Sequence, residues 1–172
     1  MRLSIVVAVE PDVKSLGLSG DFESNLVEAS QLGYDGVELF VRDPDKLDVE
    51  NIRKLTEKFN LSISAIGTGL TYTIYGLSLS SLSRTVRKKA LQRIEEYLKI
   101  GRKLNSCIVI GSIKGKVEDH QSGIENLRST LLRCAEFAEE IGTRILIEPI
   151  NRYESNLINT LDEAIKLKES YG

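Results

Sequence analysis

The residues best suited to chemistry lie in one segment, ILIEPINRYESNLINTLDEA, which spans residues 145–164. Glu148 ends a stretch that is otherwise apolar, and a carboxylate left unpaired among apolar neighbours would cost folding free energy. Glu154 follows in a loop that can turn back toward Glu148, while Asn151 and Arg152 add an amide and a fixed cation. A carboxylate at the C-terminal end of a buried parallel strand is typical of a catalytic group. The alternative is a structural ion pair between Glu148 and Arg152.

The elements that must position these residues alternate regularly along the chain. Short β-branched apolar runs, typical of strands buried on both faces, occupy residues 3–9, 36–40, 61–67, 107–111 and 144–150. Segments with apolar residues at helical spacing follow them, starting near Asp21, Asp48, Ser83, Gly123 and Thr160. Five strand–helix units in succession predict a parallel sheet with right-handed crossovers.

Two α/β architectures accept five such units, an open doubly wound sheet or part of a closed barrel. The turn after the first strand, VEPDVKSLGLSGD, has no GxGxxG pattern, which disfavours a nucleotide-binding open sheet. A (β/α)₈ TIM barrel needs eight units and about 250 residues. We therefore predict that residues 1–172 form a single incomplete barrel domain with strands one to five, strands six to eight being absent.

Composition limits the partners. The net charge is −2 and the basic residues are scattered, so we expect no binding to nucleic acid. No apolar run approaches the roughly 20 residues of a membrane span, and the apolar run at the N-terminus is shorter than that of a signal peptide. We expect no membrane association and a cytoplasmic location.

The motif EPINRYE, followed by INT and a helix, resembles a segment of the sugar isomerase and epimerase family that has a xylose-isomerase-like barrel. That family includes D-tagatose and D-psicose 3-epimerases and hydroxypyruvate isomerases. The segments MRLSIVVA, YDGVELFVRDP and AIGTG extend the resemblance over essentially the whole chain. By this resemblance, Glu148 is a metal ligand and one of two acid–base carboxylates. Glu154 is similar in position to a glutamate that hydrogen-bonds the substrate, and Asn151 and Arg152 complete this part of the substrate site.

The chemistry that the resemblance implies is proton abstraction next to the carbonyl of a sugar or sugar phosphate. The resulting enediolate is held on Mn²⁺, Mg²⁺ or Co²⁺, which neutralises the developing charge. In the family the other metal ligands, an Asp, a His and a second Glu, come from strands six to eight. We therefore expect this chain alone to be inactive and to form a homo-oligomer through its uncovered sheet.

Two other functions remain as alternatives. One is a truncated, non-catalytic fragment that self-associates. The other is a DNA-repair enzyme similar to endonuclease IV, which the single histidine and the absence of a basic face disfavour.

Residues 66–80 follow the third strand and include two more candidates for the substrate site, Gly67 and Tyr72. Glycine permits close approach of the backbone to a ligand, and Tyr72, with Tyr75, provides an aromatic wall. The alternative is that this segment only packs against the barrel mouth.

Charged residues near other strand ends give weaker indications. Lys114 and Lys116 could attract a phosphorylated or acidic substrate, or could belong to a plain solvated loop. Glu38 and Arg42 are interpreted as an ion pair at the rim, without a catalytic role. His120 is interpreted as a solvated loop residue, because no second ligand lies at a suitable spacing.

Overall fold

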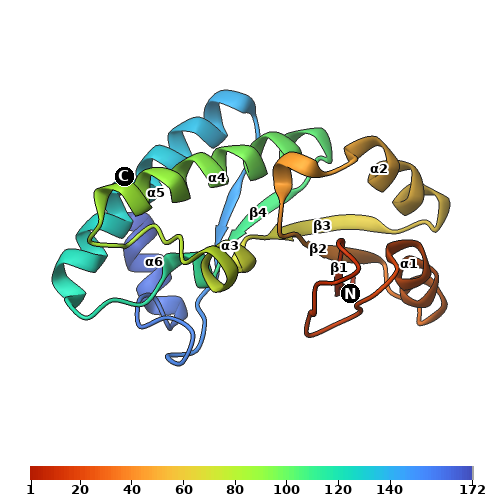
Figure 1. The fold of residues 1–172 in the computed structure, drawn as a ribbon, viewed down its shortest axis with the longest axis horizontal. Helices are drawn as coiled ribbons and strands as arrows, with labels where there is room; N and C mark the ends of the chain where they lie inside the picture. The colour runs from red at the N-terminus through yellow and green to blue at the C-terminus, as the bar shows by residue number, and fades with distance from the viewer. Residues whose placement is uncertain (172) are drawn as a thin grey trace.

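The computed structural model describes residues 1–171, and its centre is a parallel sheet of five strands (Figure 1). The order of the strands in the sheet equals their order along the chain. They are β1 (Ser4–Ala8), β2 (Gly36–Phe40), β3 (Ser62–Gly67), β4 (Cys107–Ile110) and β5 (Ile145–Ile147). All five expected strands are present. The last one ends before Pro149, which has no N–H to donate to a ladder.

Helices follow the strands, and most of their starting points agree with the sequence. They are α1 (Phe22–Gln31), α2 (Val49–Lys58), α3 (Gly69–Tyr75), α4 (Arg84–Lys103), α5 (His120–Ile141) and α6 (Leu161–Glu169). Asp21, Asp48, Ser83 and Thr160 each accept a backbone N–H in the first turn, as expected of helix caps. Asp119 caps α5, which therefore begins earlier than expected. Short 3₁₀ turns cover Pro44–Lys46 and Ser112–Lys114.

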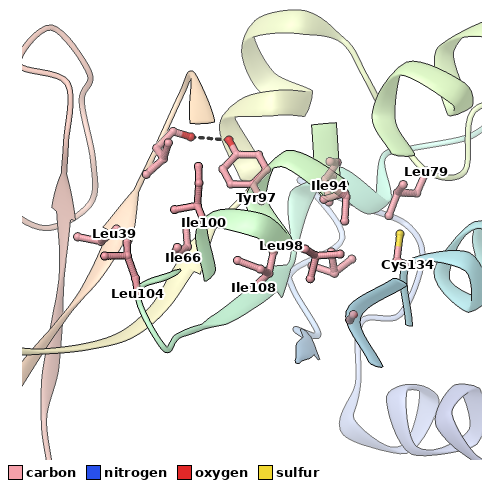
Figure 2. Close-up of a cluster of buried hydrophobic side chains, with 14 of the residues drawn as sticks. Leu39, Ile66, Leu79, Ile94, Tyr97, Leu98, Ile100, Leu104, Ile108 and Cys134 are labelled. Carbon is pink, nitrogen blue, oxygen red and sulfur yellow. Dashed lines mark hydrogen bonds between the residues drawn. The ribbon is translucent and has the colours of Figure 1, made fainter. Parts of the chain in front are cut away.

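The hydrophobic core lies between one face of the sheet and the helices α4 and α5, which run side by side (Figure 1). In Figure 2, Leu39, Ile66 and Ile108 of the strands face side chains of α4, and Cys134 of α5 closes the cluster. Tyr97 of α4 is fully buried, and its hydroxyl donates a hydrogen bond of 2.7 Å to the carbonyl oxygen of Val41. This bond fixes α4 to the chain just beyond β2.

The other face of the sheet carries the alternate side chains of the strands. The register aligns Glu38 with Ala65 and Cys107, and Gly67 with Val109 and Leu146. Most of these side chains are small, and Leu146 is 46% exposed. In a barrel this is the inner face, and its C-terminal end is where a site is expected.

In the part of the chain that the structure describes, no helix combines the length and the apolar character that crossing a membrane requires.

Candidate active site

Glu148 lies at the C-terminal end of β5 on the inner face of the sheet. Its backbone N–H donates to the carbonyl oxygen of Ile110 at 3.1 Å, which continues the β4–β5 ladder by one residue. Ile145 and Ile147 pack against the core, whereas Leu146 and Glu148 are exposed on the opposite face. The alternation of strand side chains thus turns the Glu148 carboxylate toward the space that a barrel would enclose.

Gly111 provides the room for this carboxylate. A Cβ atom placed on Gly111 would collide with Oε2 of Glu148, so any larger residue at the end of β4 would displace the glutamate. Glu148 therefore leans from its own strand over the end of β4.

Glu154 reaches the same end of the sheet from the loop between β5 and α6. Its Oε2 accepts a hydrogen bond of 3.0 Å from the Ser112 hydroxyl, directly after β4. Its Oε1 accepts a 2.5 Å bond from the amide of Asn151, whose own Oδ1 accepts the N–H of Glu154 at 3.2 Å. Asn151 thus orients Glu154, and both carboxylates flank the residues that follow β4.

Lys114 lies behind these two carboxylates and is fully buried. Its ammonium donates to the carbonyl oxygens of Gly111 at 3.0 Å and Glu148 at 2.5 Å, so it joins the ends of β4 and β5. Burial lowers the pKa of Lys114 to about 8, an effect that the charges of Glu148 and Glu154 oppose. The hypothesis that Lys114 attracts a substrate from a rim loop is therefore wrong, because the side chain turns inward to satisfy two carbonyl groups.

Glu38 is also on the inner face, in the middle of β2, where it is half-buried. Burial raises the pKa of its carboxyl, and the charge of Glu148 raises it further. The expected ion pair between Glu38 and Arg42 is wrong, since Arg42 binds Asp12 at 2.6 Å and Asp43 at 3.2 Å. Strand β2 ends at Phe40, so Arg42 belongs to the loop that follows the strand, whereas Glu38 remains within it.

The remaining predicted substrate-binding residues are not all brought to the carboxylates, since Arg152 belongs to a separate cavity between α5 and α6. Gly67 ends β3 beside Glu38, and Tyr72 lies half-buried in α3, a helix that sequence analysis missed. Arg152 lines a cavity of about 470 Å³ together with Arg128 of α5 and residues of α6. Among residues 1–171 no ion pair joins Arg152 to Glu148, so the structural alternative for that pair does not hold.

The described residues do not build a metal centre by themselves. Within residues 1–171, no three side chains of His, Cys, Asp or Glu come close enough to hold an ion. Glu38 and Glu148 bring two carboxylates toward one space, whereas Mg²⁺ requires six oxygen ligands. His120 is exposed at the start of α5 and adds no ligand there.

Sequence analysis did not predict that Glu38 lies on the inner face or that Lys114 joins the ends of two strands. A signal for Glu38 was present, because Val37 and Leu39 flank it in GVELF and the two faces of a strand alternate. If Val37 and Leu39 face the helices, Glu38 faces the barrel interior. Nothing in the sequence indicates the inward turn of Lys114, which depends on a short 3₁₀ turn and on the neighbouring strand.

Comparison with known proteins identifies the architecture. The family model described as xylose isomerase-like TIM barrel matches residues 26–171. This chain belongs to the xylose isomerase-like TIM barrel family. The predicted α/β fold, a five-stranded part of a TIM barrel, is thereby confirmed.

Curated proteins with named activities resemble the chain over most of its length. An L-ribulose 3-epimerase of Mesorhizobium japonicum is 27% identical over 161 residues, which cover 88% of this chain and 52% of that protein. A ketose 3-epimerase of Arthrobacter globiformis is 25% identical, and the alignment covers 81% of this chain and 48% of that protein. The chain spans about half the length of the curated relatives that it matches.

A solved structure shows the same fold. A D-psicose 3-epimerase, determined in the presence of D-fructose, aligns with the whole chain at a TM-score of 0.79 and 21% identity. The alignment covers 60% of that enzyme. The five strand–helix units of this chain therefore correspond to part of a longer barrel.

Proposed function

We propose that residues 1–171 form one side of the active site of a ketose 3-epimerase or a related sugar isomerase. The observation that carries this proposal is the position of Glu148. Its carboxylate stands on the inner face at the C-terminal end of β5, beside Glu154, in a family whose relatives include named ketose 3-epimerases. The chemistry is removal and return of a proton next to the sugar carbonyl, through an enediolate.

In this proposal the two glutamates have different tasks. Glu148 is the acid–base carboxylate that removes or returns the proton, since its side chain is exposed on the inner face. Glu154 hydrogen-bonds a substrate hydroxyl, and Asn151 and Ser112 hold its carboxylate in place. Substrate contacts by Gly67, Tyr72 and Arg152 stay predictions, and so does the distinction between a sugar and a sugar phosphate.

The proposal includes a divalent cation, Mn²⁺, Mg²⁺ or Co²⁺, with Glu148 as one of its ligands. Such an ion would supply stabilisation of negative charge next to the carbonyl. The other ligands must come from outside residues 1–171, because these residues bring too few ligands together. We accordingly expect the 172-residue chain to be inactive or nearly so when it is assayed alone.

The test is exchange of the carbon-bound proton of D-psicose or D-tagatose in D₂O with Mn²⁺, followed by NMR. We would assay the chain itself and a chimera in which residues 1–171 replace the matching half of the Arthrobacter globiformis enzyme. Glu148→Gln should abolish exchange by the chimera, whereas Glu136→Gln, on the exposed side of α5, should leave it unchanged. A folded chimera that keeps its activity with Glu148→Gln would contradict the proposal. Exchange by the chain alone would contradict only its expected inactivity.

We also propose that the chain self-associates. Strands β1 and β5 each have one neighbour in the sheet, and Leu146, on the inner face of the sheet, is 46% exposed. Unpaired edges and exposed apolar side chains both favour association. Light scattering at high micromolar concentration tests this, and a stable monomer would contradict it. A cytoplasmic location stays a prediction.

A further inference from the structure

On the β3 side of Glu38 the inner face is built from small residues, whereas Val6 of β1 and Phe40 of β2 flank Glu38 on its other sides. In the interior of a TIM barrel, bulky branched side chains normally fill successive layers. Here Ala65 pairs with Glu38 on β3, and Gly67 follows it on the same face. On β4, Val109 pairs with Gly67, and Gly111 follows two residues later, beside Glu148. No bulky side chain of β3 therefore covers Glu38, and the Phe40 ring lies beside it over Gly67, at the end of the sheet where substrate is expected.

The Glu38 carboxylate extends toward this space. A Cβ atom on Gly67 would lie 3.2 Å from Oε1 of Glu38, so the Glu38 side chain extends from β2 over β3. Glu148 leans in the opposite direction, from β5 over β4. The two carboxylates therefore approach each other across adjacent strands, with Glu38 nearer the floor, and the charge of Glu148 acts on the Glu38 carboxyl.

Glu38 has no protein partner that explains it. Among residues 1–171 its carboxylate takes part in no hydrogen bond and no ion pair, although the side chain is half-buried. A carboxyl in such a position destabilises the fold, because it loses water and gains no bond in return. Groups that are kept at a cost to stability are concentrated at functional sites.

We propose that Glu38 is a second substrate-binding residue of this site, which hydrogen-bonds a hydroxyl group of the ketose from the floor beneath Glu148. This inference rests on the proposed function and extends it. A polyhydroxylated substrate can offer one hydroxyl to Glu38 while its carbonyl end lies near Glu148 and Glu154. The site then selects ligands by a hydroxyl at a definite distance from the reacting carbon.

The experiment compares the wild-type chain with Glu38→Gln, Glu148→Gln and the control Glu136→Gln. The first measurement is the affinity for D-psicose in the presence of Mn²⁺, by titration calorimetry. We expect Glu38→Gln to weaken binding roughly tenfold or more, as for loss of a hydrogen bond to a charged group. The loss should disappear for one of the two end-deoxy analogues, 1-deoxy-D-psicose or 6-deoxy-D-psicose. A role in folding alone would weaken the binding of both analogues alike, which would overturn the inference.

The second measurement is the melting temperature without ligand. Glu38→Gln should raise it by about a few degrees, since a poorly satisfied carboxylate is removed, and Glu136→Gln should leave it unchanged. A lower melting temperature for Glu38→Gln would show a structural partner and overturn the inference. Unchanged affinity in Glu38→Gln, with affinity lost in Glu148→Gln, would overturn it and leave the proposed function intact. Absence of ketose binding by the wild-type chain would overturn the inference alone, because the proposed function is tested separately by proton exchange in the chimera.

Discussion

Acidic residues lie at two places along the C-terminal edge of the sheet, and their binding partners differ. At the β1–β2 rim, formed by Glu10, Asp12, Arg42, Asp43 and Tyr75, the carboxylates bind the protein itself. Glu10 accepts the backbone N–H groups of Arg42 and Asp43, and Asp43 accepts the Tyr75 hydroxyl at 2.5 Å. These bonds fix the loop after β2 and the end of α3. Acidic residues here serve the fold.

At the β4–β5 rim, formed by Gly111, Ser112, Lys114, Glu148 and Glu154, the nearby cation does not bind the carboxylates. The ammonium of Lys114 binds two main-chain carbonyl groups, and among residues 1–171 no cation forms an ion pair with the Glu148 side chain. The pKa values differ accordingly. The bond from Tyr75 lowers the pKa of Asp43, whereas burial and Glu148 raise that of Glu38 on the adjoining inner face. The comparison teaches that the partners of an acidic residue, more than its place on the rim, separate structural from functional candidates.

The largest effect is expected from Lys114→Met. The substitution leaves the carbonyl group of Glu148 without its buried donor and the carbonyl group of Gly111 with only the backbone N–H of residue 114, and we expect a loss of about 3 kcal/mol in the free energy of unfolding. Urea denaturation at pH 7 measures it. Lys116→Met, at an exposed neighbour, is the control and should change little. Equal stability of Lys114→Met and wild type would mean that the lysine does not hold the two strand ends together.

The same variant also predicts a pH dependence. The pKa of Lys114 is about 8 in the folded protein and about 10.4 in unfolded chains. Between these values the unfolded state binds more protons, so the contribution of Lys114 to stability increases as the pH rises. The stability difference between wild type and Lys114→Met should therefore widen from pH 8 to pH 10. A difference that narrows over this range would contradict the burial of a charged ammonium.

A smaller effect is expected at the β1–β2 rim from Asp43→Asn. The amide cannot replace the charge-assisted bonds from Tyr75 and Arg42, and the loss should be about 1–2 kcal/mol at pH 7. Because the pKa of Asp43 is lowered in the folded state, its contribution is lost as the pH falls through that value. The stability advantage of wild type over the variant should therefore shrink as the pH is lowered below the usual range of an aspartate carboxyl. Ketose affinity should not change, and a loss of affinity would remove the contrast between the two rims.

The smallest effect on stability is expected from Gly67→Ala. The added methyl group would lie 3.2 Å from Oε1 of Glu38 and 3.3 Å from the Phe40 ring, so only side chains must move, at a cost of about 1 kcal/mol. Its effect on ketose affinity should be larger, because Glu38 is displaced from the floor of the site. Calorimetric titration and thermal unfolding of the same sample separate the two effects. Loss of stability without loss of affinity would argue against a ligand above Glu38.

Much of the fold could be predicted from local patterns. Short runs of β-branched residues predict each strand. Asp21, Asp48 and Thr160 cap helices as expected. Both signals depend only on residues that are neighbours in the sequence. The same holds for the side of β5 on which Glu148 lies. Helix α3 was missed because its sequence, GLTYTIY, is short and rich in β-branched and aromatic residues that disfavour helices.

The details of the site were harder to predict, since they depend on contacts between distant units. Several acidic residues lie near Arg42 in the sequence. Arg42 binds Asp12 and not Glu38, because β2 ends before Arg42 and leaves it in the following loop. The inward turn of Lys114 requires the carbonyl of a residue on the next strand. Such choices are set by three-dimensional distance, which spacing along the chain does not encode.

The agreement between strand order and chain order has a consequence for how the protein is made. Each strand pairs with the strand synthesised just before it, so every new strand–helix unit finds its docking edge already present. Each pairing nevertheless spans a whole crossover, so every step of the assembly includes the closure of a long loop. Folding can then advance from β1 to β5 while the ribosome is still at work, and the bond from Lys114 to the end of β5 forms only after that last strand has emerged.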